Sequence, residues 1–286
     1  MSERVSFAHL PSRSLIALGG EDWRNFLQGL ITQDVETLGG GEARFGALLT
    51  PQGRLLYDLF VVANGDGAWL DVEAEHRGAL AMRLTMYRLR AKVTIAADET
   101  PVSVLFDPEA QTLAPPPPAP SPQGGGVWVR DPRLPALGWR GYGVSAPAGA
   151  AVVGEAEREA QKLRLGVPGP ADWGSDKTYP IEANFDLLNG IDFKKGCFVG
   201  QETTSRMKRR GVIKNRMLPL SFEGGAPSAG AEVLAGELRA GVVTSAAAGG
   251  GIGLMRLDRI DGASLTVDGR PVRAERPSWM SAKEPA

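Results

Sequence analysis

The chain has 286 residues, of which 43% are hydrophobic and 23% charged, and its formal net charge is −1. This composition is ordinary for a globular protein large enough for two or three domains, and the near-neutral charge gives no general reason to expect nucleic acid or an anionic membrane as a partner. The single cysteine excludes an intramolecular disulfide and fits a reducing compartment. Because the first residues lack a secretory pattern and no apolar run reaches the ~18 residues that span a bilayer, we expect a cytoplasmic protein.

The first two thirds of the chain mix helix and strand patterns. Apolar residues three and four positions apart predict helices at 21–30, 73–88 and 155–165. Apolar or alternating stretches bounded by turn residues predict strands at 14–18, 44–49, 55–63, 68–72, 91–96, 102–106, 127–129 and 141–145. Residues 107–126 hold a run of four prolines and a run of three glycines, a composition that cannot build a core and predicts a surface loop.

The last part of the chain has a different pattern. Short strands separated by glycine-rich turns are predicted at 216–222, 232–234, 238–244, 251–257, 264–267 and 271–274. Such a series predicts a small antiparallel barrel. We therefore expect an α+β protein in which residues 1–210 form two interleaved subdomains and residues 211–286 form a β-barrel.

The only cysteine lies in the segment Lys195–Glu202, directly before a predicted helix at Gln201–Arg210. A thiol at the entrance to a helix is favoured as thiolate by the positive end of the helix dipole, and the charges of Lys194 and Lys195 act in the same direction. The alternative is that Cys197 is a small buried hydrophobe, as lone cysteines usually are.

A strongly basic stretch surrounds this segment. Between Lys194 and Arg216 there are eight basic residues and one acidic residue, Glu202. Such a patch suits a carboxylated or phosphorylated ligand or nucleic acid, whereas the alternative is a solvated helix face with Glu202 and Arg206 as an i,i+4 pair. Because no aromatic residue lies between Gly200 and Arg216, we do not expect RNA.

A carboxylate interrupts the apolar strand at 55–62. Asp58 is costly there unless it is hydrogen-bonded or used, so it either lies on a wet face of the strand or orients a heterocyclic N–H or amine in a cleft. The two histidines and one cysteine do not provide three or four closely spaced ligands, so no protein-built metal site is predicted.

The segment Lys195–Glu202, followed by Arg206 and Arg210, resembles the signature of the YgfZ family. These are folate-dependent proteins of iron–sulfur cluster assembly and repair, related in fold to the aminomethyltransferase (T-protein) of the glycine cleavage system. The resemblance covers about residues 20–275 in order, through segments at 26–35, 48–58, 87–93 and 180–190.

The resemblance implies three domains in a ring around a central hole that binds tetrahydrofolate or a derivative. Asp58 takes the place of the transferases' folate-facing aspartate, and Cys197 is implied as the working thiol with Lys195 beside it. The implied cofactor-binding residues are Asp58, Glu182, Gln201, Glu202, Arg206 and Arg210. One departure concerns 163–167, where Leu-Arg-Leu is followed by Gly-Val instead of the glutamate that contacts folate in the transferases.

We therefore predict a folate-binding accessory protein that assembles or repairs iron–sulfur clusters and so supports processes such as tRNA modification. Its expected partners are iron–sulfur enzymes or cluster carrier proteins, with no membrane and no nucleic acid. The alternative is a tetrahydrofolate-dependent aminomethyltransferase that positions its amine with Asp58, which leaves open whether the protein is an enzyme. A third hypothesis is an RNA-binding module that uses the basic stretch 194–216.

Overall fold

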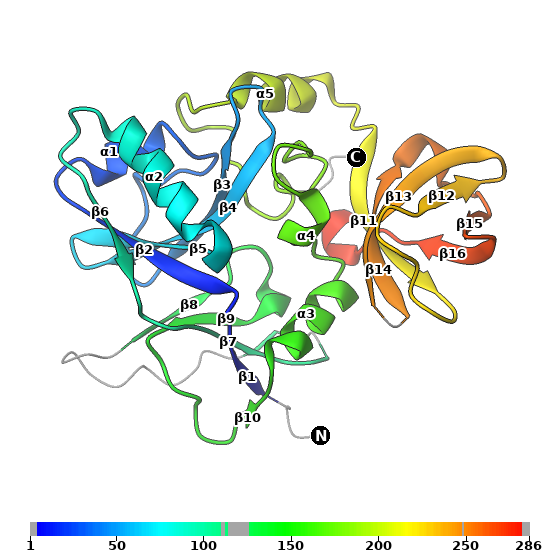
Figure 1. Ribbon diagram of the computed structural model, residues 1–286, viewed down its shortest axis with the longest axis horizontal. Helices are drawn as coiled ribbons and strands as arrows, with labels where there is room; N and C mark the ends of the chain where they lie inside the picture. The colour runs from blue at the N-terminus through cyan, green and yellow to red at the C-terminus, as the bar shows by residue number, and fades with distance from the viewer. Residues whose placement is uncertain (1–4, 110–111, 114–125, 248, 282–286) are drawn as a thin grey trace. The chain divides into compact units, whose positions relative to one another are not determined.

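The computed structural model describes residues 5–109, 112–113, 126–247 and 249–281 (Figure 1). The chain forms two compact units, each assembled from separate stretches of sequence. The first unit comprises Met1–Leu49, Leu56–Gln161 and Leu188–Val199, and the second comprises Thr50–Leu55, Lys162–Leu187 and Gly200–Ala286. The predicted proline run at 115–118 lies outside the described residues, and the predicted domain boundary at 210 stays a prediction.

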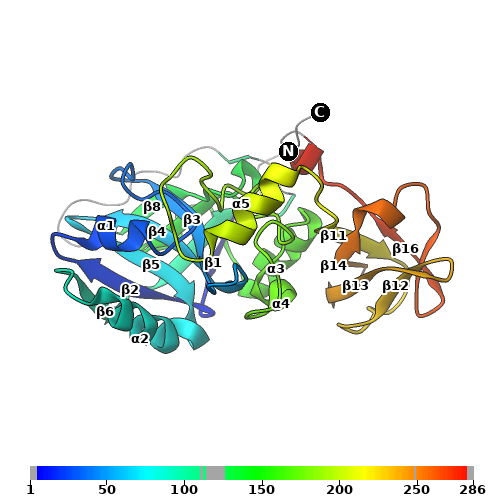
Figure 2. The same ribbon diagram turned by 90° about the horizontal axis from the view of Figure 1, so that it is seen from above.

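One sheet of the first unit carries the two helices of the N-terminal part. Its strand order is β3-β4-β5-β2-β6, with β2 paired antiparallel to both β5 and β6. Helices α1 and α2 lie beside this sheet (Figures 1 and 2) and bury Trp23 and Leu27 of α1 and Leu80 and Leu84 of α2 in a core shared with its strands. The bounds are β2 Arg13–Gly19, α1 Trp23–Gln28, β3 Ala43–Leu49, β4 Leu55–Asn64, β5 Gly67–Glu73, α2 Arg77–Arg88 and β6 Thr94–Asp98.

A second sheet of the first unit has the order β10-β1-β7-β9-β8. Residues of both sheets, among them Leu15 and Val62 of the first and Val104 and Tyr142 of the second, form a common core. Because strand side chains alternate, the face of β4 that carries Asp58, Phe60 and Val62 is turned to this core. The bounds are β1 Ser6–His9, β7 Val102–Phe106, β8 Val127–Arg130, β9 Trp139–Tyr142 and β10 Ala151–Val152, followed by α3 at Glu155–Arg164.

The second unit contains a closed six-stranded barrel in the order β11-β14-β13-β12-β15-β16. Its interior is filled by apolar side chains such as Leu218, Val233, Val243 and Met255. The bounds are α4 Pro170–Trp173, α5 Gln201–Arg210, β11 Asn215–Phe222, β12 Glu232–Ala235, β13 Leu238–Ala247, β14 Gly250–Arg256, β15 Leu265–Val267, β16 Arg270–Ala274 and α6 Ser278–Ser281. The α+β fold and the C-terminal barrel predicted from the sequence are confirmed.

Element boundaries differ from the prediction where local conformation interrupts a pattern. The strand predicted at 91–96 begins only at Thr94, because α2 ends at Arg88 and the chain turns first, with a positive φ of 45° at Leu89. The strand predicted at 141–145 is β9 and ends at Tyr142, before Gly143 with its positive φ of 65°. Within the described residues, no helix combines the length and the apolar composition that crossing a membrane requires.

Candidate functional site

Cys197 lies at the surface of the first unit. Its side chain is exposed, whereas the next residue, Phe198, is buried. The alternative that this cysteine is a small buried hydrophobe is therefore wrong. An exposed thiol needs a rigid support if it is to act at a defined place, so the contacts of its loop matter.

Lys195 fastens the cysteine loop to the end of α1. Its ammonium donates hydrogen bonds to the carbonyl oxygens of Gln28, Ile31 and Gln33, at 2.7, 2.7 and 2.8 Å. An ammonium has three protons, and here each has a carbonyl acceptor. Gln28 is the last residue of α1, so the positive charge also lies where a helix C-terminus favours one.

The pKa of Lys195 reflects this half-buried place. Burial lowers the pKa of the ammonium to about 8, against the attraction of Asp34, Asp192 and Glu36. The ammonium ion also lies 5.4 Å from the centre of the Phe198 ring, a favourable cation–π contact on the side of the loop next to Cys197. Lys195 therefore positions the loop, and its predicted part in the chemistry of the thiol stays a prediction.

Backbone hydrogen bonds hold the rest of the cysteine loop to the same segment, residues 28–33 at the end of α1. Asp192 N–H donates to the Thr32 carbonyl at 2.9 Å, and Val199 N–H donates to the Gly29 carbonyl at 3.2 Å. The buried Thr32 hydroxyl in turn donates to the carbonyl of Gly190 at 2.6 Å. Two stretches of sequence that the resemblance singles out, 26–35 and the approach to Cys197, thus form one structural feature.

Asp58 belongs to a buried network of charges between the two sheets. Its exposure is 5%, so the alternative of a wet strand face is wrong. Arg13 donates to it from Nη1 at 3.2 Å and to Asp71 from Nε at 2.7 Å. Burial opposes the positive charge of Arg13. The attraction of Asp58 and Asp71 exceeds this cost of desolvation and holds the pKa of Arg13 above its usual value.

The two buried aspartates differ in how many donors they have. Asp71 accepts hydrogen bonds from Arg13, Arg140 and the Tyr142 hydroxyl, and it is fully buried. Among the residues that the structure describes, the one donor to Asp58 is Arg13, at 3.2 and 3.5 Å. A carboxylate offers about four acceptor positions, so Asp58 retains capacity for another donor. Burial, together with the charge of Asp58, raises the pKa of Glu73.

The network continues around Asp131, which the sequence did not single out. This fully buried carboxylate accepts from Arg133 at 2.9 and 2.7 Å and from Arg158 at 3.2 Å. Although burial opposes ionisation, Arg133 leads the attractions that hold the pKa of Asp131 well below its usual range. Arg158 also donates to the Leu137 carbonyl at 2.6 Å, but burial still lowers its pKa to about 9. Charged residues inside apolar stretches of sequence are the signal that could have pointed to Asp131, Arg133 and Arg158.

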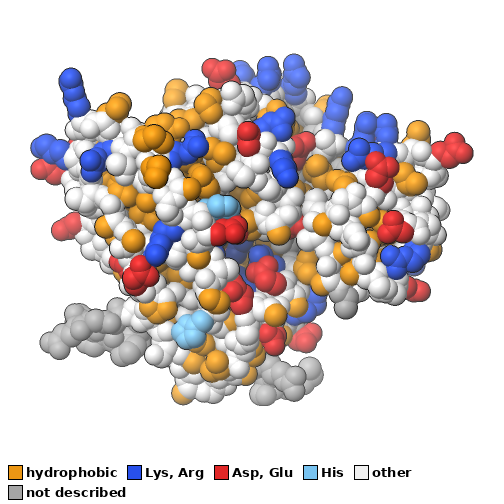
Figure 3. Space-filling model, viewed as in Figure 1, with side chains coloured by type: hydrophobic (Ala, Val, Ile, Leu, Met, Phe, Trp, Pro, Cys, Tyr) orange, Lys and Arg blue, Asp and Glu red, His pale blue; other side chains and the backbone are white. Residues whose placement is uncertain are grey.

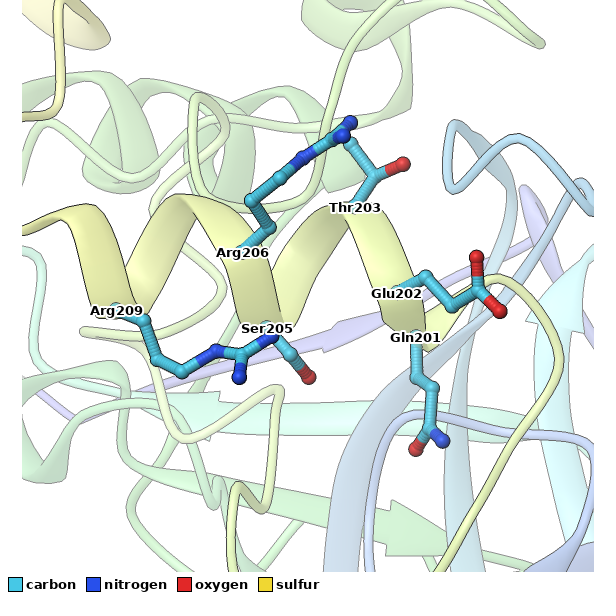
Figure 4. Close-up of a pocket in the computed structure, with 6 residues that line it drawn as sticks. All are labelled: Gln201, Glu202, Thr203, Ser205, Arg206 and Arg209. Carbon is cyan, nitrogen blue, oxygen red and sulfur yellow. The ribbon is translucent and has the colours of Figure 1, made fainter.

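Helix α5 of the second unit carries four of the predicted binding residues. A surface hollow of about 630 Å³ is lined by Gln201, Glu202, Thr203, Ser205, Arg206 and Arg209, and does not include Arg210 (Figure 4). Figure 4 shows Gln201, Ser205 and Arg209 pointing to one side of the helix and Thr203 and Arg206 to the other. Glu202 and Arg206 point apart there and form no described ion pair, so the i,i+4 pair considered from the sequence is wrong.

The hairpin tip at 50–54 supports the start of α5. A Cβ on Gly53, whose φ is +85°, would lie 2.8 Å from the carbonyl oxygen of Gly200 and 3.1 Å from the Cβ of Thr203. Gly200 is the N-cap of the helix and is itself left-handed, with φ 78°. Only a glycine at position 53 allows this close approach.

Two further predicted charges have structural partners. Glu182 accepts from the Tyr179 N–H at 3.2 Å and from the Asn215 amide at 3.0 Å. Arg216, at the end of the basic stretch, is buried in a bidentate pair with Asp186 at 2.9 and 3.0 Å. The charge available to a ligand on this stretch is therefore smaller than the sequence count indicates.

Comparisons with known proteins agree with this architecture. A family model described as the CAF17 C-terminal beta-barrel domain matches residues 214–282. The solved aminomethyltransferase T of the glycine cleavage system from Bartonella henselae has a similar fold, with a TM-score of 0.77 at 19% identity over 96% of this chain and 86% of that one. At this identity the match concerns the fold, and it confirms the predicted relation to the glycine cleavage T-protein in architecture.

Curated relatives extend the match over most of the chain. The mouse protein named iron–sulfur cluster assembly factor IBA57, mitochondrial, is 30% identical over 283 residues, covering 88% of this chain and 78% of its own length. The Mycosarcoma maydis IBA57 homologue is 32% identical over 240 residues, covering 77% of this chain. The chain spans 58% of that fungal protein. The human IBA57 protein is 29% identical over 249 residues, covering 77% of this chain and 67% of its own length.

These relatives correct the predicted location. Each is named a mitochondrial protein, so the prediction of a cytoplasmic protein is wrong. The prediction rested on a lone cysteine and a missing secretory pattern, which indicate a reducing compartment but do not separate the cytoplasm from the mitochondrial matrix.

Proposed function

The chain belongs to the family of the iron–sulfur cluster assembly factor IBA57, and from this premise we propose that it acts in the assembly or repair of iron–sulfur clusters with Cys197 as its working thiol. The observation that carries the proposal is an exposed thiol on a loop that Lys195 fastens through three carbonyl oxygens. A thiol held in this way can meet a partner protein in one orientation.

The chemistry of one thiol limits the role. Iron in a cluster is bound by several thiolates, and Cys197 supplies one of them after it loses its proton. Within the described residues, Cys197 is in no group of three closely spaced metal-ligating side chains. The remaining ligands must then come from a carrier protein or a client enzyme, so the cluster is cargo that passes between proteins.

An in vitro titration tests the thiol. The full chain is mixed with ferric iron, sulfide and glutathione, which provides the other thiolates, and visible charge-transfer absorption is recorded. We expect absorption with the wild type and little with Cys197→Ala. Lys177→Met, a change at an exposed lysine far from Cys197 in the sequence, serves as control and should behave as wild type. Equal absorption from Cys197→Ala and wild type would contradict the proposal.

We also propose that tetrahydrofolate or a derivative binds at Asp58. Support comes from the spare acceptor capacity of this buried carboxylate, which suits the N–H groups of a pterin ring. Asp58 would accept from the ring, and Arg13 would hold the carboxylate in place. The other predicted folate-binding residues, Gln201, Glu202, Arg206 and Arg210, lie on α5 of the second unit, and their part in folate binding stays a prediction.

Calorimetric titration with tetrahydrofolate tests this second proposal. We expect binding to the wild type and to Asp66→Asn, an exposed turn variant, and weaker binding to Asp58→Asn. No binding to the wild type would refute the folate proposal and leave the proposal for Cys197 standing. Unchanged affinity in Asp58→Asn would refute the role of that carboxylate alone.

The similarity in fold to an aminomethyltransferase makes a folate-dependent one-carbon transferase the second candidate function. In that case the chain would transfer a one-carbon unit to tetrahydrofolate, with Asp58 positioning the reacting amine. The assay is turnover of tetrahydrofolate with an aminomethyl donor. Turnover that Asp58→Asn abolishes and Cys197→Ala leaves intact would favour the enzyme over the assembly factor.

A further inference from the structure

Helix α2 exposes a ridge of large apolar side chains. Met82, Met86 and Leu89 follow one another at i, i+4 and i+7, which places them on one side of the helix, and their exposures are 68%, 61% and 88%. Leu80 and Leu84 fill the opposite side against the sheet, so the ridge is not needed for the core. Figure 3 shows hydrophobic side chains gathered over this helix with Lys and Arg side chains nearby.

The ridge differs from ordinary scattered exposure. Seven large hydrophobic side chains are exposed among the described residues, and three of them form this ridge. The other four, Val152, Phe193, Val212 and Leu238, lie in four different segments. Single exposed apolar residues need no explanation, but a row of three on one helix marks a candidate interaction surface.

The backbone at Leu89 gives a second, independent observation. Leu89 directly follows the last residue of α2 with φ 45° and ψ −107°, a positive-φ conformation that favours glycine and that a leucine rarely adopts. Strained backbone positions cluster at functional sites, and this leucine is 88% exposed, so its side chain does not contribute to the core. The strained position adds to the reasons for treating the ridge as a candidate interaction surface.

The charges that α2 and the residues directly after it carry are of one sign. From Arg77 to Lys92 the sequence has five basic residues and no acidic one. Arg77 and Lys92 pair with Glu99 and Glu21, while Arg83, Arg88 and Arg90 have no ion pair among the described residues. A partner that covers the ridge must bring negative charge to its edges.

We propose that the ridge Met82–Met86–Leu89 docks an amphipathic helix of a partner protein, whose apolar stripe is flanked by Asp and Glu. Methionine side chains are flexible and polarisable, so they adapt to a helix packed along them. A second copy of this chain is disfavoured as the occupant, because pairing two α2 ridges would oppose their basic edges. This surface is independent of the thiol and folate proposals, so its failure would leave them unaffected.

Two synthetic helical peptides of about 18 residues test the proposal on the full chain. Both carry leucines at three- and four-residue spacing and a fluorescein label; one has glutamates on its flanks and the other has lysines. Fluorescence anisotropy measures their binding. We expect the glutamate peptide to bind about tenfold or more tightly than the lysine peptide at low salt, with the gap narrowing as salt rises.

Variants locate the binding on the ridge. The double change Met82→Ser with Met86→Ser should weaken binding of the glutamate peptide about tenfold, and Leu238→Ser, an equally exposed leucine on the barrel, should leave it unchanged. Leu89→Gly should weaken binding and raise the melting temperature, since it removes the strain together with the contact. A merely structural role for Leu89 would not produce these opposite effects.

Several results would overturn the proposal. These are equal binding of the two peptides, no binding of either, or an equal loss with Leu238→Ser. Sedimentation that shows a dimer of the wild type, lost in Met82→Ser with Met86→Ser, would overturn it too, because a second copy would then be the occupant.

Discussion

Replacing Asp131 with asparagine tests whether the buried charge network holds the first unit together. Asp131→Asn keeps the shape of the side chain but removes its charge and part of its acceptor capacity. Arg133 and Arg158, both buried, then lose an anionic partner to which they donate at 2.9, 2.7 and 3.2 Å. Removing one partner of a buried ion pair costs about 3–5 kcal/mol, because the remaining charge stays desolvated. We expect a loss of about 4 kcal/mol in the free energy of unfolding.

A matched control lies on the barrel. Arg256 and Asp258 form the same kind of i,i+2 pair, with hydrogen bonds of 3.1 and 2.8 Å, but at the surface. Urea unfolding followed by circular dichroism is measured for wild type, Asp131→Asn and Asp258→Asn. We expect a large loss for Asp131→Asn and little or none for Asp258→Asn, because water screens the exposed pair. Equal losses, or a loss below about 1 kcal/mol for Asp131→Asn, would show that the buried network does not hold the first unit together.

Three further predictions concern pH, the cysteine loop and the hairpin tip. The pKa of Asp131 is held below its usual range, so its contribution to the free energy of unfolding is present above about pH 5 and is lost as pH falls towards 2. The difference in this free energy between wild type and Asp131→Asn should therefore narrow over that window, which urea unfolding at a series of pH values measures. Lys195→Met should lower the free energy of unfolding by about 1–3 kcal/mol, since three carbonyl oxygens lose their donor, whereas urea unfolding of Lys194→Met should match wild type. Gly53→Ala should lower the melting temperature more than Gly65→Ala, since both glycines have positive φ but a Cβ at 65 meets nothing within 4 Å; equal shifts would contradict the close approach to Gly200.

The sequence predicted most elements because their patterns are local. The α5 segment, for example, lies between Gly200 and Gly211, both left-handed, and its predicted bounds agree with the structure. The barrel strands were separated by glycine-rich turns, and all six were found close to their predicted places. Local patterns gave the correct end of α2 at Arg88 but placed the start of the next strand at 91 instead of Thr94, because no residue preference indicates the positive φ of Leu89.

The candidate site depended on contacts far apart in the sequence. Lys195 was predicted to act on the thiol because it lies two residues away, yet its ammonium is bound to carbonyls more than 160 residues earlier. Residue types do not show which backbone carbonyls will accept a hydrogen bond, so the contact of Lys195 with residues 28–33 could not be predicted. The burial of Asp58 could not be predicted either, because its partner Arg13 comes from another strand. Only the presence of a carboxylate in an apolar strand indicated that a partner was needed.

The activity of iron–sulfur enzymes in cells that lack this protein shows whether Cys197 serves the cluster. A strain without the gene is complemented with wild type, Cys197→Ala, Cys197→Ser or the exposed-lysine control Lys177→Met, and the activity of a [4Fe–4S] dehydratase is measured at matched protein levels. We predict that wild type and Lys177→Met restore the activity and that both cysteine variants fail to do so. Full restoration by Cys197→Ala would contradict the claim that this thiol serves the cluster.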